Sequence, residues 1–231
     1  MDTLQIISII SLITGGVCAI IIAIDITADH KQKMMIMNFV YPITGLYGSI
    51  FALLFYFTIG RKSSAKDDMH SHTDDEPAMK HDKKPFWQSV SIDALHCGSG
   101  CTIGDILAET LLLFVPVVIF GSSLAGSWTI DYIFAFVIGI IFQYYSIKPM
   151  KNLSPRKALK AALKADTLSL TSWQIGMYGW MAISYFLIFH RRIPTTEPLF
   201  WFMMQIAMLL GFATAFPTNW WLIKKGIKDP M

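Results

Sequence analysis

The sequence predicts an all-α, polytopic integral membrane protein with about six transmembrane helices. Apolar residues make up 54% of its 231 residues and charged residues only 15%, whereas a soluble domain carries about a quarter charged residues. The apolar residues gather into runs long enough to cross a bilayer, which takes roughly 20 helical residues. Backbone groups in hydrocarbon must pair within their own segment, so each run is predicted to be a helix: Leu4–Ile24, Ile36–Ile59, Ala94–Phe120, Trp128–Ile147, Leu168–Phe189 and Leu199–Ile223.

The first run is predicted to be a retained helix rather than a cleaved signal peptide. No basic segment precedes it, and Asp25 stands where a small-residue cleavage site would be expected. Tryptophans in the last two runs are predicted to lie at the membrane interface, where their amphipathic rings are enriched: Trp173, Trp180, Trp201, Trp220 and Trp221.

Composition divides the chain into three parts. Residues 1–60 form an N-terminal two-helix membrane part, residues 61–86 a polar His/Asp-rich cytoplasmic linker, and residues 87–231 a four-helix membrane domain that carries the HCGSGC motif. The linker is too polar to fold alone, and a solvated tether is a simpler interpretation than weak metal capture by its histidines. Before the fifth run, NLSPRKALKAALKAD (152–166) is predicted to start a helix at Ser154-Pro155 and to lie as a basic amphipathic segment on the inner membrane surface.

Lysine and arginine predict the orientation. If the N-terminus is inside, the inner loops carry 15 of these residues and the outer loops carry 4. Basic loops stay on the cytoplasmic side, so both termini are predicted to be cytoplasmic in the cell inner (plasma) membrane. The net charge of +3 is therefore a topology signal, and no nucleic-acid partner is expected. No nucleotide-binding loop is visible in the sequence, which argues against direct coupling to ATP.

The third run carries a polar stripe. Asp93, Cys97, Cys101, Asp105 and Glu109 recur at every fourth position of DALHCGSGCTIGDILAE. Steps of four keep helical residues on one slowly drifting face. A charged side chain at membrane depth costs about 2.5–3.5 kcal/mol and indicates function by default. Glycines beside the stripe let another backbone or a bound ion approach.

His96, Cys97 and Cys101 are predicted to capture a metal ion, with Asp105 and Glu109 continuing its path or exchanging protons. Thiolate and imidazole ligands suit a transition metal such as Cu(I) or Zn(II). Small buried cysteines are the alternative interpretation, and it is preferred for the lone Cys18. The 13 methionines are interpreted mainly as core filling.

Polar residues of other runs are candidates to face this stripe. Asp166 is the most interesting, because it enters the fifth run from the same inner face as Cys97. The other candidates could equally form ordinary hydrogen bonds between helices. They are Asp25, Gln143, Gln174, Gln205 and Asn219.

Four segments resemble a prokaryotic family of multi-spanning membrane proteins that is catalogued as a domain of unknown function. They are HCGSGCTIGDILAE, KADTLSL, WFMMQI and NWWLIKKGIK, and the resemblance spans nearly the whole chain outside the linker. It implies a multi-helix membrane protein but no particular activity. The positions that it marks in this sequence are Asp25, His96, Cys97, Cys101, Asp105, Glu109, Asp166 and Asn219.

These observations predict a membrane protein that binds a soft transition metal, Cu(I) before Zn(II), at HCGSGC for transport or delivery. One alternative is a membrane thiol oxidoreductase, because cysteines at i and i+4 lie about 6 Å apart, within disulfide range. Another is a non-catalytic assembly subunit of a membrane complex, so the sequence leaves open whether the protein is an enzyme. The expected partners are the lipid bilayer and a metallochaperone or metalloenzyme, and oligomer formation stays open.

Overall fold

The computed structural model describes residues 3–32, 34–61, 85–151 and 154–228. Helices dominate these residues, and the β pairing found among them is one isolated bridge between Ile119 and Ser122. The all-α prediction is confirmed. The elements are α1 (Thr3–Ala28), α2 (Met37–Phe55), the π-helical η1 (Tyr56–Gly60), α4 (Phe86–Phe114), α5 (Ser123–Lys151), α6 (Pro155–Ile183), the π-helical η2 (Ser184–Ile188) and α7 (Pro198–Lys224).

Five helices are long and apolar enough to cross a membrane, judged by length and composition alone. They are α1, α2 together with η1, α4, α5 and α7. The predicted number of about six long helices agrees with this count to within one helix, and α6 is the helix that is not among the five. Its first turns carry four basic residues that precede the predicted run: Arg156, Lys157, Lys160 and Lys164. The predicted run Leu168–Phe189 is thus the second part of a longer helix that ends in η2.

The basic segment before this run is not a separate surface helix. Pro155 takes the first position of α6, as predicted, and the helix continues without a break for 29 residues. The side chain of Ser154 makes no capping hydrogen bond. Ala162 and Ala165 are buried against Ile140 and Ile147 of α5, which keeps these early turns in the bundle.

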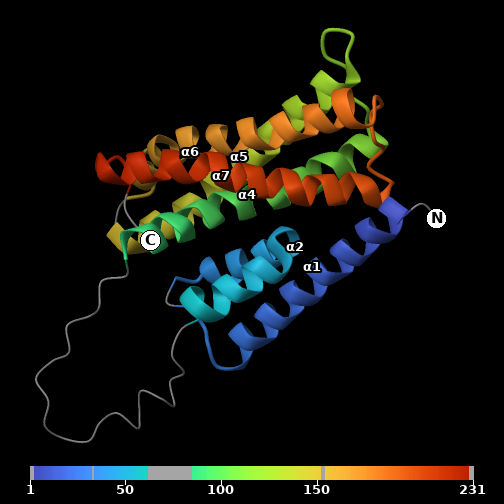
Figure 1. The fold of residues 1–231 in the computed structure, drawn as a ribbon. Helices are drawn as coiled ribbons and strands as arrows, with labels where there is room; N and C mark the ends of the chain where they lie inside the picture. Colours follow the sequence, from blue (N-terminus) through green and yellow to red (C-terminus); the bar gives the residue numbers. More distant parts are fainter. Residues whose placement is uncertain (1–2, 33, 62–84, 152–153, 229–231) are drawn as a thin grey trace, which may run out of the picture.

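The second predicted run, Ile36–Ile59, folds back on itself instead of crossing straight through the bundle. Ser49 interrupts α2 with φ of 45° and ψ of −125°. The rings of Tyr41 and Tyr56 lie 5.2 Å apart, whereas a straight helix would separate these positions by about 22 Å along its axis. Residues 37–48 and 50–60 therefore form a helical hairpin, and Figure 1 shows its two arms beside α1.

Hydrogen bonds close the hairpin at its base and pair a backbone carbonyl near its tip. At the base, Tyr56 and Arg61 donate hydrogen bonds to Asp25 of α1, over 2.8 Å and 2.9–3.1 Å. Near the tip, the Gln205 amide donates to the backbone carbonyl of Leu46 over 2.7 Å. Interrupted backbone at membrane depth is tolerated where protein groups satisfy it, and Gln205 provides such a group.

The hairpin changes which ends of the chain lie together. Figure 1 shows α1 starting near the start of α7, while α7 ends at the far end of the bundle beside the start of α4. Two contacts fix this arrangement: Ser11 donates to Gln205 over 2.7 Å, and the rings of Phe86 and Trp220 lie 4.7 Å apart. The described ends of the chain therefore lie at opposite ends of the bundle, which does not fit the prediction of two termini on one side.

Small residues bring α4 against α5. A Cβ atom on Gly104 would lie 2.5 Å from the backbone of Ala135, and one on Gly100 would lie 3.0 Å from Gly139. This is the small-residue packing of membrane helices, in which van der Waals contact replaces hydrophobic driving force. The glycines thus serve the approach of another backbone, which was one of the two predicted uses.

The bundle core centres on a tryptophan that was predicted to be interfacial. Trp173 is fully buried, and its ring fills the space beside Gly98 of α4 and Gly211 of α7. The Tyr47 ring from the hairpin meets it edge-on, with centroids 6.1 Å apart. The interfacial prediction fails for this residue because only a large flat side chain fills the gap that two glycines leave.

Candidate functional site

The predicted stripe on α4 is buried along its whole length. The exposed fraction of Asp93, Cys97 and Cys101 is 0%, that of Asp105 is 1%, and that of Glu109 is 4%. Sixteen residues separate the first from the last, which is about 24 Å of helix and most of the thickness of a bilayer core. A face with this polarity and this length connects the two ends of the bundle.

The inner end of the stripe, at the start of α4, surrounds the amino group of Lys228. Its Nζ atom lies 2.9 Å from Asp93 Oδ2 and 3.2 Å from Asp166 Oδ1. It also lies 3.2 Å from Asn219 Oδ1 and 3.5 Å from Cys97 Sγ. Three helices, α4, α6 and α7, therefore meet around an amino group that the C-terminal tail supplies.

The turn after α7 returns Lys228 to the bundle. Gly226 takes a left-handed conformation with φ of 66°, which glycine adopts without strain. The backbone N–H of Ile227 then donates to the Leu222 carbonyl over 3.0 Å. Burial alone would lower the pKa of Lys228, but the neighbouring carboxylates, led by Asp93, raise it above its ordinary value. The side chain therefore stays positively charged at neutral pH.

Cys97 joins this inner cluster to the rest of the stripe. Its Sγ atom donates to Asp166 Oδ1 over 3.0 Å and lies 3.0 Å from Ser169 Oγ. One turn further along α4, the Gln174 amide donates to Cys101 Sγ over 3.8 Å. The residues facing both thiols come from α6, as was predicted for Asp166 and Gln174.

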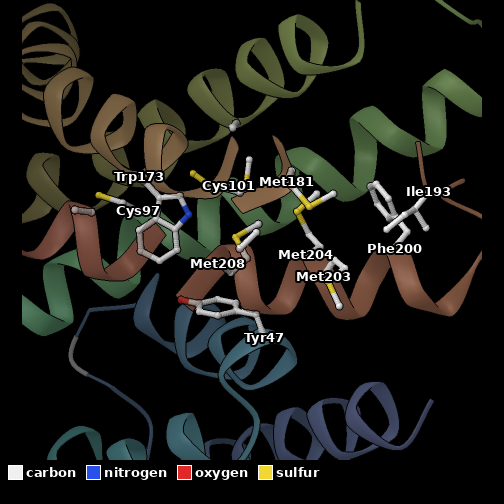
Figure 2. Packing of buried hydrophobic residues seen from close by; sticks show 14 of the residues in the cluster. Tyr47, Cys97, Cys101, Trp173, Met181, Ile193, Phe200, Met203, Met204 and Met208 are labelled. Atoms are coloured by element: carbon white, nitrogen blue, oxygen red, sulfur yellow. The ribbon is translucent and has the colours of Figure 1, made fainter. Parts of the chain in front are cut away.

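Sulfur atoms concentrate in the middle of the bundle. Thr102 of α4 donates a long hydrogen bond of 3.9 Å to the thioether of Met208. Figure 2 shows methionine side chains of α6 and α7 on the side of Cys101 that faces away from Cys97, whereas Trp173 lies beside Cys97. The buried hydrophobic core around Trp173 and Leu170 contains seven sulfur side chains, which are called the sulfur cluster below: Cys97, Cys101, Met177, Met181, Met203, Met204 and Met208.

A cavity lies between this sulfur cluster and the hairpin. Its volume is about 200 Å³, several times the share of one water molecule in the liquid. Asp105 is the charged residue among those that line it, and the cavity also reaches the tip of the hairpin. Its lining includes Leu46, Tyr47, Thr102, Asp105, Met204 and Met208.

The outer end of the stripe is a group of three buried carboxyl groups. Glu109 and Asp131 of α5 are hydrogen-bonded to each other. A hydrogen bond between two carboxyl groups needs a proton on one of them, so this pair is a place where a proton can be held. Among the residues described, neither oxygen of Asp105 has a hydrogen-bond partner.

Arg192 sits over this outer group. Its guanidinium donates to Ser127 over 2.6 Å and to Ser123 over 3.0 Å, which anchors it to the first turns of α5. It also interacts electrostatically with Glu109. The stripe is thus flanked by one basic residue at each end, Lys228 near the start of α4 and Arg192 near its end.

Not every predicted site residue joins the stripe. His96 is buried, but its ring packs against Phe142 of α5, with centroids 5.8 Å apart. Asp25 closes the base of the hairpin and Gln205 satisfies its tip, so both have structural partners away from the thiols. In the described ranges no group of three or more His, Cys, Asp and Glu side chains is arranged to hold a metal ion. The linker residues Met69, His70, His72, Met79 and His81 lie outside the described residues.

Sequence reasoning missed Asp131, Arg192 and Lys228. Asp131 had a signal, because an acidic residue inside the run Trp128–Ile147 indicates function at membrane depth. Arg192 and Lys228 stand in short polar segments outside the helices, where basic residues usually report topology alone. Their contacts with the stripe arise from chain turns that no local pattern predicts.

Comparison with known proteins returns one family. The sequence model described as "Domain of unknown function (DUF4396)" matches residues 86–228, which span all of α4 to α7 and the turn that carries Lys228. The chain therefore belongs to this family, in agreement with the resemblance noted from its motifs. No curated protein and no solved structure matches the chain.

Proposed function

We propose that this member of the DUF4396 family is a membrane transporter that moves a soft monovalent metal ion, Cu(I) foremost, along the α4 stripe. One observation carries the proposal. Both thiols of the stripe lie in the same buried cluster as five methionine thioethers, between carboxyl groups at either end. Thiolate and thioether ligands select Cu(I) over harder ions.

The arrangement of ligands favours a passing ion over a resident one. Zn(II) requires about four nitrogen or sulfur ligands in a closed tetrahedral site, and the described residues offer no such set of His, Cys, Asp and Glu. Cu(I) accepts two sulfur ligands, so it can pass between successive pairs along the cluster. The metal is therefore the cargo of the protein, and no bound cofactor is required.

The hairpin supports transport in a second way. Transporters place their ion sites at interrupted helices near the bilayer midplane, where unwound backbone lines a cavity. Here the tip at Ser49 is interrupted, and the cavity beside it reaches Asp105, Met204 and Met208. The carboxyl pair Glu109–Asp131 at the other end of the stripe can hold a proton, and an arriving cation would displace it.

The orientation follows from the revised path of the chain. The hairpin returns Arg61 to the side on which α1 ends, so the connection from α1 to α2 joins the side on which α4 begins and α7 ends. The basic imbalance between the two sides then changes from 15 against 4 to 17 against 2. We propose that this basic side is cytoplasmic, in the cell membrane, and that the N-terminus lies on the opposite side.

The burial of both cysteines argues against a thiol oxidoreductase. A dithiol enzyme needs an accessible thiolate that a partner can attack. The exposed fraction of Cys97 and of Cys101 is 0%, and both are free thiols. If Cys101→Ser traps a covalent partner while purified wild-type protein shows negligible Cu(I) binding, the oxidoreductase replaces the transporter.

Reconstituted protein tests the proposal. Full-length protein in proteoliposomes should admit Cu(I), kept reduced, to a Cu(I)-specific fluorescent chelator in the lumen. Cys97→Ser and Cys101→Ser remove the soft ligand with little change of shape, and each should slow uptake at least about tenfold. Cys18→Ser is the matched control, because Cys18 is also buried but lies on α1 outside the sulfur cluster, and it should leave uptake unchanged.

The carboxyl groups separate transport from simple binding. Asp105→Asn and Glu109→Gln keep shape and remove charge, so they should leave Cu(I) binding at the thiols intact while stopping uptake. Wild-type uptake no faster than in protein-free vesicles would refute the transport function. Uptake at the wild-type rate in both cysteine variants would refute the sulfur path.

A further inference from the structure

We propose that Asp93, Asp166, Asn219 and Cys97 form a binding site for a monovalent cation at the inner end of the stripe, and that the Lys228 ammonium occupies this site as a tethered competitor. The proposal rests on the proposed function only in treating the site as the inner entrance of the path. The cation site itself follows from the four contacts around Lys228.

The contacts around Lys228 form a cage. Two carboxylate oxygens, one amide oxygen and one sulfur atom converge on a single nitrogen within 2.9–3.5 Å. A surface ion pair joins two groups, whereas here atoms from α4, α6 and α7 surround a side chain that is 0% exposed. A compact positive charge on a flexible stem, such as an ammonium group, is the natural stand-in for a monovalent metal ion.

The lysine leaves part of the cage unsatisfied. Within the part of the chain that is described, the acceptor atom Asp166 Oδ2 is buried without a hydrogen-bond partner. An unsatisfied buried polar atom costs about 1–3 kcal/mol and calls for an explanation such as a missing ion. A cation that replaced the ammonium between these helices would have the freedom to engage both Asp166 oxygens.

The attachment of Lys228 permits exchange. The residue follows α7 by four positions and reaches the cage through one turn, with Gly226 in the left-handed conformation. Opening that turn removes Lys228 and leaves the helices that supply the cage unchanged. Cys97 belongs both to the cage and to the sulfur cluster, so the ammonium and an entering metal ion exclude each other at the first thiol.

Two variants release the competitor by different means. Lys228→Met keeps the length of the side chain and removes its charge. Gly226→Val keeps the charge but disfavours the left-handed turn, and a Cβ atom there would meet no other atom within 4 Å. Lys225→Met is the matched control, because this lysine lies on the same tail and is exposed.

The melting temperature of detergent-solubilised full-length protein reports the site, because a cation that binds the folded state raises it. Ag⁺ serves as a redox-stable soft probe and K⁺ as a hard one. For Lys228→Met and Gly226→Val the Ag⁺ concentration at half of the maximal shift should be at least about tenfold below that of wild type. Lys225→Met should match wild type, and Asp166→Asn added to Lys228→Met should abolish the gain.

One result would overturn the proposal. If neither Ag⁺ nor K⁺ stabilises Lys228→Met or Gly226→Val more than wild type, Lys228 is a structural ion-pair partner and the cage is no cation site. If Lys228→Met does not fold, Gly226→Val alone decides in the same way. The proposed function fails separately: a tighter cation site in these variants, with no Cu(I) uptake by any protein, would keep the cage and remove the transporter.

Discussion

Alanine at position 104 should separate α4 from α5. The Cβ atom would lie 2.5 Å from both the nitrogen and the Cα atom of Ala135, against an ordinary contact of at least 3.4 Å. The obstacle is helix backbone, which cannot rotate away as a side chain can. The two helices must therefore move apart locally by about 1 Å, and the contacts around the new methyl group are lost.

The expected magnitude follows from two opposing effects. Overpacking of a close contact costs typically about 1–3 kcal/mol. Replacing glycine by alanine within a helix returns about 0.8–1 kcal/mol. The net free energy of unfolding of Gly104→Ala should therefore fall by up to about 2 kcal/mol. Because Asp131 lies one turn from Ala135, the same displacement should weaken its hydrogen bond to Glu109 and slow Cu(I) uptake.

Two further glycines make the test a graded series. A Cβ atom on Gly100 would lie 3.0 Å from Gly139, so Gly100→Ala should cost less than Gly104→Ala. Gly179 of α6 has open space at its Cβ position, so Gly179→Ala should be neutral or stabilising by up to about 1 kcal/mol. Reversible unfolding by SDS in mixed micelles measures all three. Equal stabilities, or a Gly104→Ala variant more stable than Gly179→Ala, would refute the close approach of α4 and α5.

Three other predictions test the hairpin and the linker. Single cysteines introduced at Met35 and Thr196 should be labelled from opposite sides of the membrane, with position 35 on the side of the linker. Labelling of both positions from the same side would contradict the hairpin and would mean that residues 36–59 form a straight crossing helix. Ser49→Gly should raise the melting temperature, because glycine relieves about 1–2 kcal/mol of strain at φ of 45°, whereas Ser49→Ile should lower it; the opposite order would contradict the interrupted tip. Replacing the three linker histidines His70, His72 and His81 by alanine should leave the Cu(I) stoichiometry of purified protein unchanged, because ordering a polar tether opposes coordination. Loss of a full equivalent of Cu(I) would place the site in the linker.

The polar stripe illustrates what local periodicity predicts. Positions that differ by four share a face in any α-helix, so the common direction of Cys97, Cys101 and Asp105 follows from their spacing alone. Their burial follows from the cost of exposing such groups to lipid. Which partners they meet depends on the rotation of neighbouring helices, and only part of the predicted set faces them. Asp166 and Asn219 do so, whereas Gln205 caps the hairpin tip and Asp25 binds Arg61.

The hairpin and the inner cage show where local patterns stop being informative. The run Ile36–Ile59 has the length and composition of a crossing helix, and the reversal depends on one backbone conformation at Ser49. That conformation is held by contacts with α1 and α7, such as the Gln205 bond to Leu46, which are distant in sequence. Lys228 reaches Asp93 across more than half of the chain for the same reason.

The sequence by itself determined the all-α class, most of the long helices and the buried face of α4, because hydrophobic runs and helical spacing act over a few residues at a time. The tertiary structure alone decided that α2 turns back, that Asp131 lies against Glu109, and that Lys228 fills the end of the stripe at the start of α4. Each of these features depends on a buried polar group finding its partner on another helix. The choice of partner belongs to the packing of the whole bundle, because an unpaired group is costly wherever it is buried and several alternatives satisfy the same local pattern.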